Sequence, residues 1–193
     1  GKAVEGFEVK TSDQGEILIR GAGVFKEYYK NPETTAESFT EDGFFRTGDK
    51  ADMDADGFVT ITGRVKDLFK SGKGKYIAPV PIEAKLADNQ LIEQICVMGS
   101  GLPAAIAEIV LSEEDANGMS KSEIEESLAE TLEAVNKVVE KHEVVGGIRI
   151  VKEPWTIENG LLTPTLKVKR AELEAKYMDF CEQHADKPVI WEA

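Results

Sequence analysis

Apolar and polar residues alternate with a period of two in the first third of the chain, which predicts strands and turns with little helix. One strand is expected at residues 16–20. A β-hairpin is expected where 49–53 and the half-buried strand 58–62 flank a turn at 54–57 that ends in glycine. A short helix is expected at 31–39, where a proline stands in the first turn. These residues alone would form a poor core.

A different pattern begins after the glycine-rich stretch that follows residue 70. Apolar runs predict strands at 92–99, 104–111 and 148–151. A short helix is expected at 82–87, and an amphipathic closing helix is indicated by Leu173, Tyr177, Phe180 and Cys181. Helices that alternate with strands predict an α+β domain over 67–193, preceded by a β-rich segment over 1–66.

The longest expected helix spans residues 120–141. Ser120 and Glu123 have the spacing of a capping box, which satisfies two backbone amides at a helix start. The apolar face that follows has helical spacing and comprises Ile124, Leu128, Leu132, Val135 and Val139. The many acids of 112–143 are expected to form a solvated face, and Gly146-Gly147 is expected to separate this helix from the next strand.

Composition limits the possible partners and locations. The chain has 193 residues, 41% hydrophobic and 31% charged, which suits a globular protein with a core. It lacks an apolar run of about 18 residues, and no targeting signal is readable at its start, which looks like a cut. Its formal net charge of −13 argues against nucleic-acid binding. A cytoplasmic location is expected.

Cysteine and histidine do not form a recognisable reactive or metal-binding pattern. Cys96 and Cys181 stand alone in apolar or amphipathic surroundings, so reduced, buried thiols are expected rather than a disulfide or a zinc site. His142 and His184 lie in charged stretches that predict helix, far from any nucleophile motif. A catalytic triad and a metal site are therefore not expected.

Positive charge is concentrated in two places, where an anion would be held. The first, residues 63–75, contains Arg64, Lys66, Lys70, Lys73 and Lys75 with Asp67 as its one acid. The second contains Lys167, Lys169 and Arg170.

Asp49 and Arg64 are candidate ligand contacts. Asp49 ends the run Phe-Arg-Thr-Gly-Asp, where its two carboxylate oxygens can accept hydrogen bonds from a vicinal diol such as a ribose. The alternative is a turn aspartate that caps its own backbone. Arg64 offers a planar fork for phosphate or ribose oxygens, and Lys66 a point charge. The alternative for Arg64 is a surface pair with an aspartate in a linker.

Two further segments combine charge with an unusual backbone. In the loop 70–77, Gly72 and Gly74 allow backbone amides to approach an anion or a narrow thiol-bearing arm, although the spacing is not that of a P-loop. In the run 162–170, Lys167 and Lys169 alternate with apolar residues, so both amines are expected on one face of an extended segment. Such an amine can neutralise charge that develops on a phosphate. The alternative is a solvated basic strand.

Taken together, these motifs resemble the adenylate-forming acyl-CoA synthetases. The runs that carry the resemblance are 45–49, 63–72 and 163–167, and the continuation Gly-Lys-Tyr-Ile-Ala-Pro at 74–79 favours the C-terminal portion of a long-chain fatty acid–CoA ligase. The resemblance implies that 1–66 are the last strands of a large, truncated adenylation domain and that 67–193 are a small mobile lid.

The resemblance also implies roles for single residues. Asp49 would grip the ATP ribose, Arg64 would contact the nucleotide with help from Lys66, and Asp67 would be the hinge. Lys167 would be the catalytic lysine, with Lys169 as the alternative. The loop that lines the path of CoA would include Lys70, Gly72, Gly74 and Tyr76. Relatives commonly have glycine where this chain has Leu166.

The implied reaction joins a fatty acid to ATP, with Mg²⁺ on the triphosphate, and then transfers the acyl group to CoA. The phosphate loop and the fatty-acid tunnel would lie in the N-terminal domain, so this fragment alone is expected to be inactive. The resemblance is compatible with peripheral membrane association of the intact enzyme. Two alternatives stay open: an acyl–carrier-protein ligase or other adenylating enzyme, and a non-catalytic module that binds a partner through its acidic helix.

Overall fold

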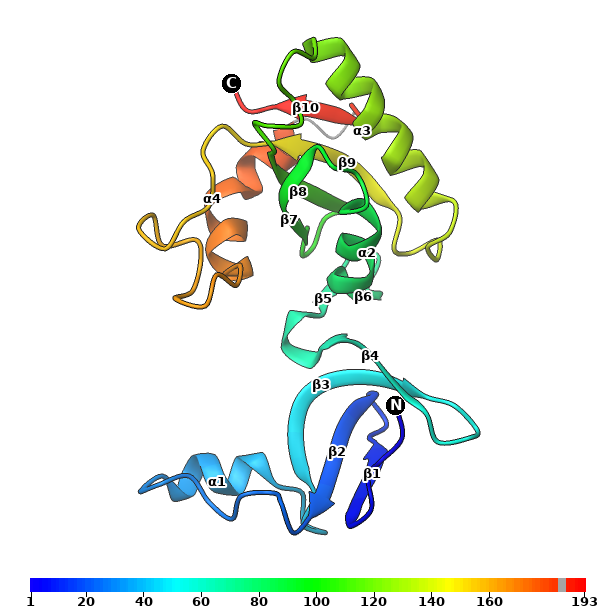
Figure 1. Cartoon of the computed structure of the whole chain (residues 1–193), viewed down its shortest axis with the longest axis vertical. Helices are drawn as coiled ribbons and strands as arrows, with labels where there is room; N and C mark the ends of the chain where they lie inside the picture. Colours follow the sequence, from blue (N-terminus) through cyan, green and yellow to red (C-terminus); the bar gives the residue numbers. More distant parts are fainter. Residues whose placement is uncertain (184–186) are drawn as a thin grey trace. The chain divides into compact units, whose positions relative to one another are not determined.

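The computed structural model describes residues 1–183 and 187–193, so His184 lies outside the described part. The chain divides into two compact units, unit 1 (Gly1–Lys66) and unit 2 (Asp67–Ala193). Each unit is built on its own four-stranded sheet (Figure 1).

Unit 1 is a four-stranded antiparallel sheet with one helix. The strands follow the order β1-β2-β3-β4 and are β1 (Phe7–Thr11), β2 (Glu16–Gly21), β3 (Phe45–Met53) and β4 (Val59–Arg64). Helix α1 (Pro32–Ser38) starts as predicted, because the side chain of Asn31 accepts a hydrogen bond from the Thr34 amide at 3.1 Å.

The predicted hairpin is confirmed between β3 and β4. The Asp54 side chain accepts hydrogen bonds from the amides of Asp56 and Phe58, and Gly57 has a φ of +79°, which glycine tolerates without strain. The strand is less buried than its alternation predicts, since Ile61 is 65% exposed. Helix α1 packs against β3 and buries none of its own residues.

The core of unit 1 is small, as expected. Its buried apolar side chains are Ile17, Leu18, Phe44 and Ala51.

Unit 2 is built on a mixed four-stranded sheet with the order β10-β9-β8-β7. Its strands are β7 (Ile92–Met98), β8 (Ala105–Leu111), β9 (Val145–Ile150) and β10 (Val189–Trp191). Strands β7 and β8 are antiparallel, whereas β8, β9 and β10 run parallel. The unit begins with a short hairpin of β5 (Phe69–Lys70) and β6 (Tyr76–Ile77).

Helices cover both faces of this sheet, which confirms the predicted mixed α+β class (Figure 1). Helices α2 (Pro79–Leu86) and α3 (Lys121–Asn136) share one apolar cluster with residues of the sheet such as Val97 and Ile148. Helix α4 (Arg170–Gln183) packs Leu173 and Tyr177 on a second cluster that includes Cys96 and Met98. Cys96 and Cys181 are buried free thiols, as predicted.

The structure corrects two predicted boundaries. The capping box at Ser120 is present, but α3 ends at Asn136, whose side-chain amide bonds both the amide and the carbonyl of Val145. Gly146 and Gly147 do not break the chain before β9 but lie inside it. A Cβ on Gly147 would lie 2.7 Å from the Arg149 guanidinium and 3.0 Å from the carbonyl oxygen of Lys187, so a glycine is needed for close approach.

No helix among the described residues is long and apolar enough to cross a membrane.

Candidate functional site

Asp49 and Arg64 are brought together by the pairing of β3 with β4. They are register partners, and Nε of Arg64 lies 3.3 Å from Oδ1 of Asp49. The side chains are 32% and 55% exposed for Asp49 and Arg64, so both keep a face toward solvent. Asp49 lies within a strand and not in a turn, and it pairs with Arg64 across the sheet rather than capping its own backbone.

The backbone before Asp49 is held by its neighbours. Gly48 has a φ of +72°, and its amide donates to Oε1 of Glu16 at 3.0 Å. Thr47 donates through its hydroxyl to the carbonyl of Ile17 at 2.8 Å and accepts from the Asp49 amide at 3.1 Å. Glu16 was not among the predicted site residues. Its position at the start of a strand gave no signal, because the contact depends on strand pairing.

Lys66 and Asp67 lie on a single turn of 3₁₀ helix, η1 (Val65–Asp67). The division into compact units falls between these two residues. Lys66 is exposed, and Asp67 is partly exposed.

The glycine-rich loop does not offer its glycine amides to a ligand, contrary to the expectation. The amide of Gly72 donates to the carbonyl of Leu102 at 2.7 Å, and that of Gly74 donates to the carbonyl of Ser71 at 2.8 Å. A Cβ on Gly72 would lie 2.6 Å from the carbonyl oxygen of Gly101. Gly72 is therefore required for packing against the loop between β7 and β8.

The lysine side chains of this loop and that of Tyr76 are accessible: Lys70, Lys73, Lys75 and Tyr76 are all exposed. Tyr76 is 61% exposed, and Nζ of Lys70 lies 5.6 Å from the centre of its ring. They form a cationic and aromatic surface at the β5–β6 hairpin.

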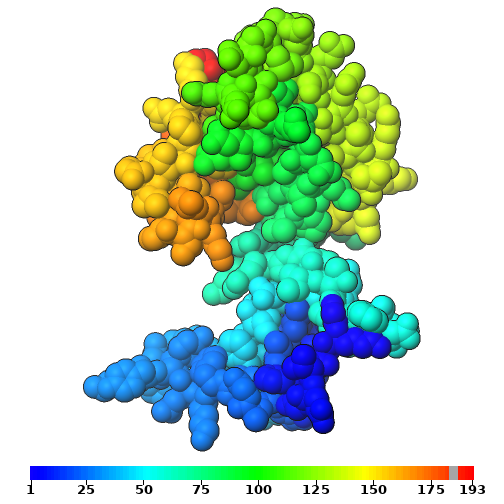
Figure 2. Space-filling model, viewed as in Figure 1, coloured from blue at the N-terminus to red at the C-terminus, as the bar shows by residue number. Residues whose placement is uncertain are grey.

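Lys167 stands on a tight turn, and the predicted extended segment is wrong. The Thr163 amide donates to the carbonyl of Lys167 at 2.8 Å, the Leu166 amide donates to the carbonyl of Thr163 at 2.8 Å, and the Lys167 amide donates to the Thr163 hydroxyl at 3.1 Å. Leu166 reverses the chain in a left-handed conformation with a φ of +60°. Local hydrogen bonds thus override the alternating pattern. Lys167 is exposed. The segment around it, coloured yellow to orange, lies at the surface of unit 2 in Figure 2.

Lys167, Lys169 and Arg170 do not form one anion-binding cluster as predicted. Arg170 is 18% exposed and pairs with Glu83 of α2 at 2.8 Å. Its charge is therefore committed within the unit, which leaves the two exposed lysines as the anion-binding candidates.

A second polar cluster lies beneath α4. Glu108 and Arg149 are register partners on β8 and β9, and both are fully buried. Sγ of Cys181 donates to Oε1 of Glu108 at 3.3 Å. Burial raises the pKa of Glu108 to about 8, although the bond from Cys181 and the charge of Arg149 oppose the shift. Burial also raises the pKa of Cys96 to about 12.

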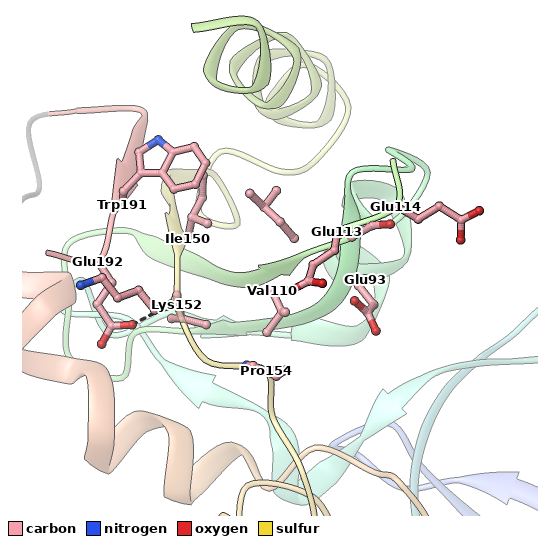
Figure 3. A pocket seen from close by; sticks show the side chains of 12 residues that line it. Glu93, Val110, Glu113, Glu114, Ile150, Lys152, Pro154, Trp191 and Glu192 are labelled. Atoms are coloured by element: carbon pink, nitrogen blue, oxygen red, sulfur yellow. Dashed lines mark hydrogen bonds between the residues drawn. The ribbon is translucent and has the colours of Figure 1, made fainter. Parts of the chain in front are cut away.

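A hollow of about 580 Å³ opens beside the carboxyl ends of β8, β9 and β10 (Figure 3). Its charged lining is mainly acidic and comprises Glu93, Glu113, Glu114, Glu192 and Lys152. The Lys152 amide donates to the Glu192 carboxylate at 2.9 Å, as the dashed line shows. This acidic hollow contains none of the predicted site residues, and its charge would repel a phosphate.

Among the described residues, no group of three or more His, Cys, Asp or Glu side chains is placed to hold a metal ion.

Comparisons with known proteins show the family to which the chain belongs. Residues 67–187 match the family described as AMP-binding enzyme C-terminal domain. The chain therefore belongs to this family of AMP-binding enzymes.

Two curated relatives show which enzymes the chain is similar to. The chain is 36% identical over 193 residues to the long-chain-fatty-acid–CoA ligase FadD15 of Mycobacterium tuberculosis, a match that covers 92% of this chain and 32% of the relative. It is 34% identical over 182 residues to the long-chain-fatty-acid–[acyl-carrier-protein] ligase AEE15 of Arabidopsis thaliana, which covers 88% of this chain and 25% of the relative. The chain thus spans about a third or less of the length of these relatives.

A solved structure supports the fold. The adenylation domain of the carboxylic acid reductase of Segniliparus rugosus, in complex with AMP and a co-purified carboxylic acid, superposes with a TM-score of 0.76 at 28% identity. The match covers 94% of this chain and 31% of that one.

Proposed function

We propose that this chain is the C-terminal part of a long-chain fatty acid–CoA ligase. Residues 1–66 are then the last strands of its large adenylation domain, and 67–193 are its mobile lid. The observation that carries the proposal is the exposed amine of Lys167 on a hydrogen-bonded turn of a domain whose family is established. The similarity to curated fatty acid–CoA ligases supports the substrate class.

In the first half-reaction, a carboxylate oxygen of the fatty acid attacks the α-phosphorus of ATP, and the bond to pyrophosphate breaks. Lys167 offsets the negative charge that grows on the phosphoryl oxygens during this attack. Asp49 accepts hydrogen bonds from the ribose hydroxyls, while Arg64, with Lys66 nearby in sequence, contacts the nucleotide. Mg²⁺ enters with the triphosphate of the substrate.

In the second half-reaction, the sulfur of CoA attacks the acyl carbonyl and displaces AMP. Rotation of the lid about Asp67 moves Lys167 away from the reacting acyl group and brings the β5–β6 hairpin to it. The accessible surface of Lys70 and Tyr76 then lines the path of CoA. Gly72 and Gly74 shape this hairpin rather than bind the ligand through their amides, which the internal hydrogen bonds support.

The test is Lys167→Ala in the full-length protein that contains this chain. Pyrophosphate exchange into ATP, which reports adenylate formation, is expected to fall by a factor of about 100 or more. Thioester formation from a synthetic acyl-adenylate and CoA is expected to be retained, because that step does not need Lys167. Lys169→Ala is the comparison for the second lysine. Undiminished exchange in Lys167→Ala would overturn the assignment.

An acyl carrier protein is the one specific alternative to CoA as acceptor of the acyl group, because the relative AEE15 is named as an acyl-carrier-protein ligase. Parallel assays with CoA and with a phosphopantetheinyl carrier protein separate the two. A wild-type protein that forms no adenylate at all would instead favour a non-catalytic module that binds through the acidic face of α3.

We also propose that the intact enzyme works in the cytoplasm and binds membrane surfaces peripherally to collect its acyl substrate. This rests on the chemistry of that substrate. Co-sedimentation of the full-length protein with lipid vesicles tests it, and a protein that stays in the supernatant at low ionic strength contradicts it.

A further inference from the structure

Lys167 belongs to a long excursion from the sheet, residues 152–169, which we call the lysine arm. Both ends of the lysine arm are attached to β7. Near its start, the side chain of Gln94 forms two hydrogen bonds with the backbone of Trp155: Nε2 donates to the carbonyl at 3.0 Å, and Oε1 accepts from the amide at 2.8 Å. The Trp155 side chain is almost fully buried.

The other end is attached through Arg170, which directly follows the lysine arm. Nη2 of Arg170 lies 2.8 Å from Oε1 of Glu83, and the same carboxylate oxygen accepts from the Val97 amide at 2.7 Å. Nη1 of Arg170 donates to the carbonyl of Val97 and to Sγ of Cys96 at 3.0 Å. The ion pair therefore binds both the amide and the carbonyl of one residue of β7, Val97, and its side chains are only 18% and 15% exposed for Arg170 and Glu83.

Two further hydrogen bonds hold the start of α4. The carboxylate of Glu174, one helical turn after Arg170, accepts from the amides of Gly99 and Ser100 at 3.3 and 3.0 Å. Side chains four residues apart lie on one face of a helix, so Arg170 and Glu174 fix that face to the end of β7.

The stem of the lysine arm is closed between these attachments. Leu162 and Val168 form an antiparallel bridge, and the Lys169 amide donates to the carbonyl of Leu161 at 2.9 Å. Leu161 and Leu162 are buried, whereas Lys167 is exposed. The hydrogen-bonded stem therefore holds the backbone of Lys167 in place, three residues before Arg170. Contacts of the Lys167 side chain do not hold it.

We propose that Arg170 is a positioning residue for Lys167, with Gln94 as the second fixed point. The proposal rests on the proposed function. A displacement of about 1 Å in a reacting group can lower the rate by about 100-fold. A lysine on a loop without these attachments must in addition lose conformational freedom to reach the transition state. Loss of the Arg170 contacts should therefore slow adenylate formation without removing any group that touches the substrates.

The experiment uses Arg170→Met in the full-length protein. The kcat of pyrophosphate exchange is expected to fall by about 10- to 100-fold with little change in the KM for ATP. Thioester formation from a preformed acyl-adenylate is expected to stay within about two-fold. Arg170→Lys, which keeps one charged contact to Glu83, should give an intermediate rate. Lys137→Met removes an exposed ion pair with Glu133 and is the matched control, with both half-reactions unchanged.

Amide hydrogen exchange on the 193-residue chain gives a readout independent of activity. In Arg170→Met, the amides of Thr163 and Lys167 should lose protection while those of β8 and β9 keep it. If Arg170→Met fails to fold, Gln94→Met is the variant that tests the proposal, because it removes only neutral hydrogen bonds. It should cause the same selective loss of exchange protection and of adenylation.

Adenylation at the wild-type rate in Arg170→Met, or an equal loss in both half-reactions by the folded variant, would overturn the positioning role. A wild-type protein without adenylation activity would overturn the proposed function instead. In that case, the exchange measurement still shows whether Arg170 holds the lysine arm.

Discussion

Arg64 and Asp49 face each other across β3 and β4, with Nε of the guanidinium 3.3 Å from Oδ1 of the carboxylate. A pair this exposed contributes under about 1 kcal/mol to stability. Both groups are therefore available for a ligand at small cost to the fold.

Asp49→Asn in the full-length protein should raise the KM for ATP by about 10-fold or more, because a charge-assisted hydrogen bond contributes about 1.5–3 kcal/mol. Arg64→Met should act in the same direction, and the double variant should show less than the sum, since the two residues are in contact. The measurement is initial-rate pyrophosphate exchange. Asp52→Asn, an exposed carboxylate on the same strand, is the control, and equal effects at both aspartates would contradict the assignment.

Leu166→Gly should stabilise the 193-residue chain. Leu166 has a φ of +60°, and a left-handed conformation costs an L-residue about 1–2 kcal/mol that glycine does not incur. Part of this gain is offset by the greater freedom of glycine in the unfolded chain, so an increase of about 1 kcal/mol in the free energy of unfolding is expected.

Urea denaturation measures this change. Leu166→Ala is the matched control, because it removes the same exposed side chain but keeps the strained backbone. A gain in the alanine variant equal to that in the glycine variant would show that backbone strain is not the cause.

Glu108 should make the stability of unit 2 fall as pH rises. Its pKa is raised from 4.5 to about 8 in the folded protein, so the folded state holds the proton over a range where the unfolded state has released it. The free energy of unfolding should therefore decrease between about pH 4.5 and 8 by up to about 1.4 kcal/mol per pH unit. The charged groups that act on Glu108 are Arg149, Glu192 and Lys176, besides the thiol of Cys181.

Thermal unfolding of the 193-residue chain at several pH values measures the slope. Glu108→Gln should flatten it, because the amide does not titrate, whereas Glu130→Gln on the exposed face of α3 should leave it unchanged. A slope that Glu108→Gln does not alter would show that Glu108 is ionised throughout this range.

Cys96 and Cys181 should resist alkylation in the folded chain. Both are buried, and burial raises the pKa of each thiol, which leaves little thiolate at neutral pH. Labelling by iodoacetamide at pH 8, followed by mass spectrometry, should modify neither residue in the native chain and both in urea. Rapid native labelling of either cysteine would mean that α4 opens readily.

Local patterns predicted the elements whose signals lie within a few residues. The capping box at Ser120, the helix start at Asn31 and the hairpin turn at Gly57 all depend on neighbours in the chain, and all are present. Periodicity failed where local geometry competed with it. The alternation around Lys167 predicts a strand, but the hydrogen bonds of Thr163 and the left-handed Leu166 form a turn.

Contacts between segments that are distant in the chain could not be predicted from the sequence. Strand β10 has three residues, and it is a strand because it pairs with β9. Arg170 reads as part of a basic cluster until α2 brings Glu83 to it. The Gly72 amide is bonded to Leu102, thirty residues away.

The sequence by itself determined the family resemblance, the mixed helix-and-sheet class and the candidate residues, because motifs and periodicity are properties of neighbouring positions. Only the tertiary structure decided which charges remain accessible. Arg149 is buried within unit 2 and Arg170 is partly buried there in an ion pair with Glu83, whereas Arg64 and Lys167 are exposed. Burial and pairing depend on which segments pack together in the fold. The free energy of a charged side chain is determined by its burial and its partners, and not by its position in the sequence.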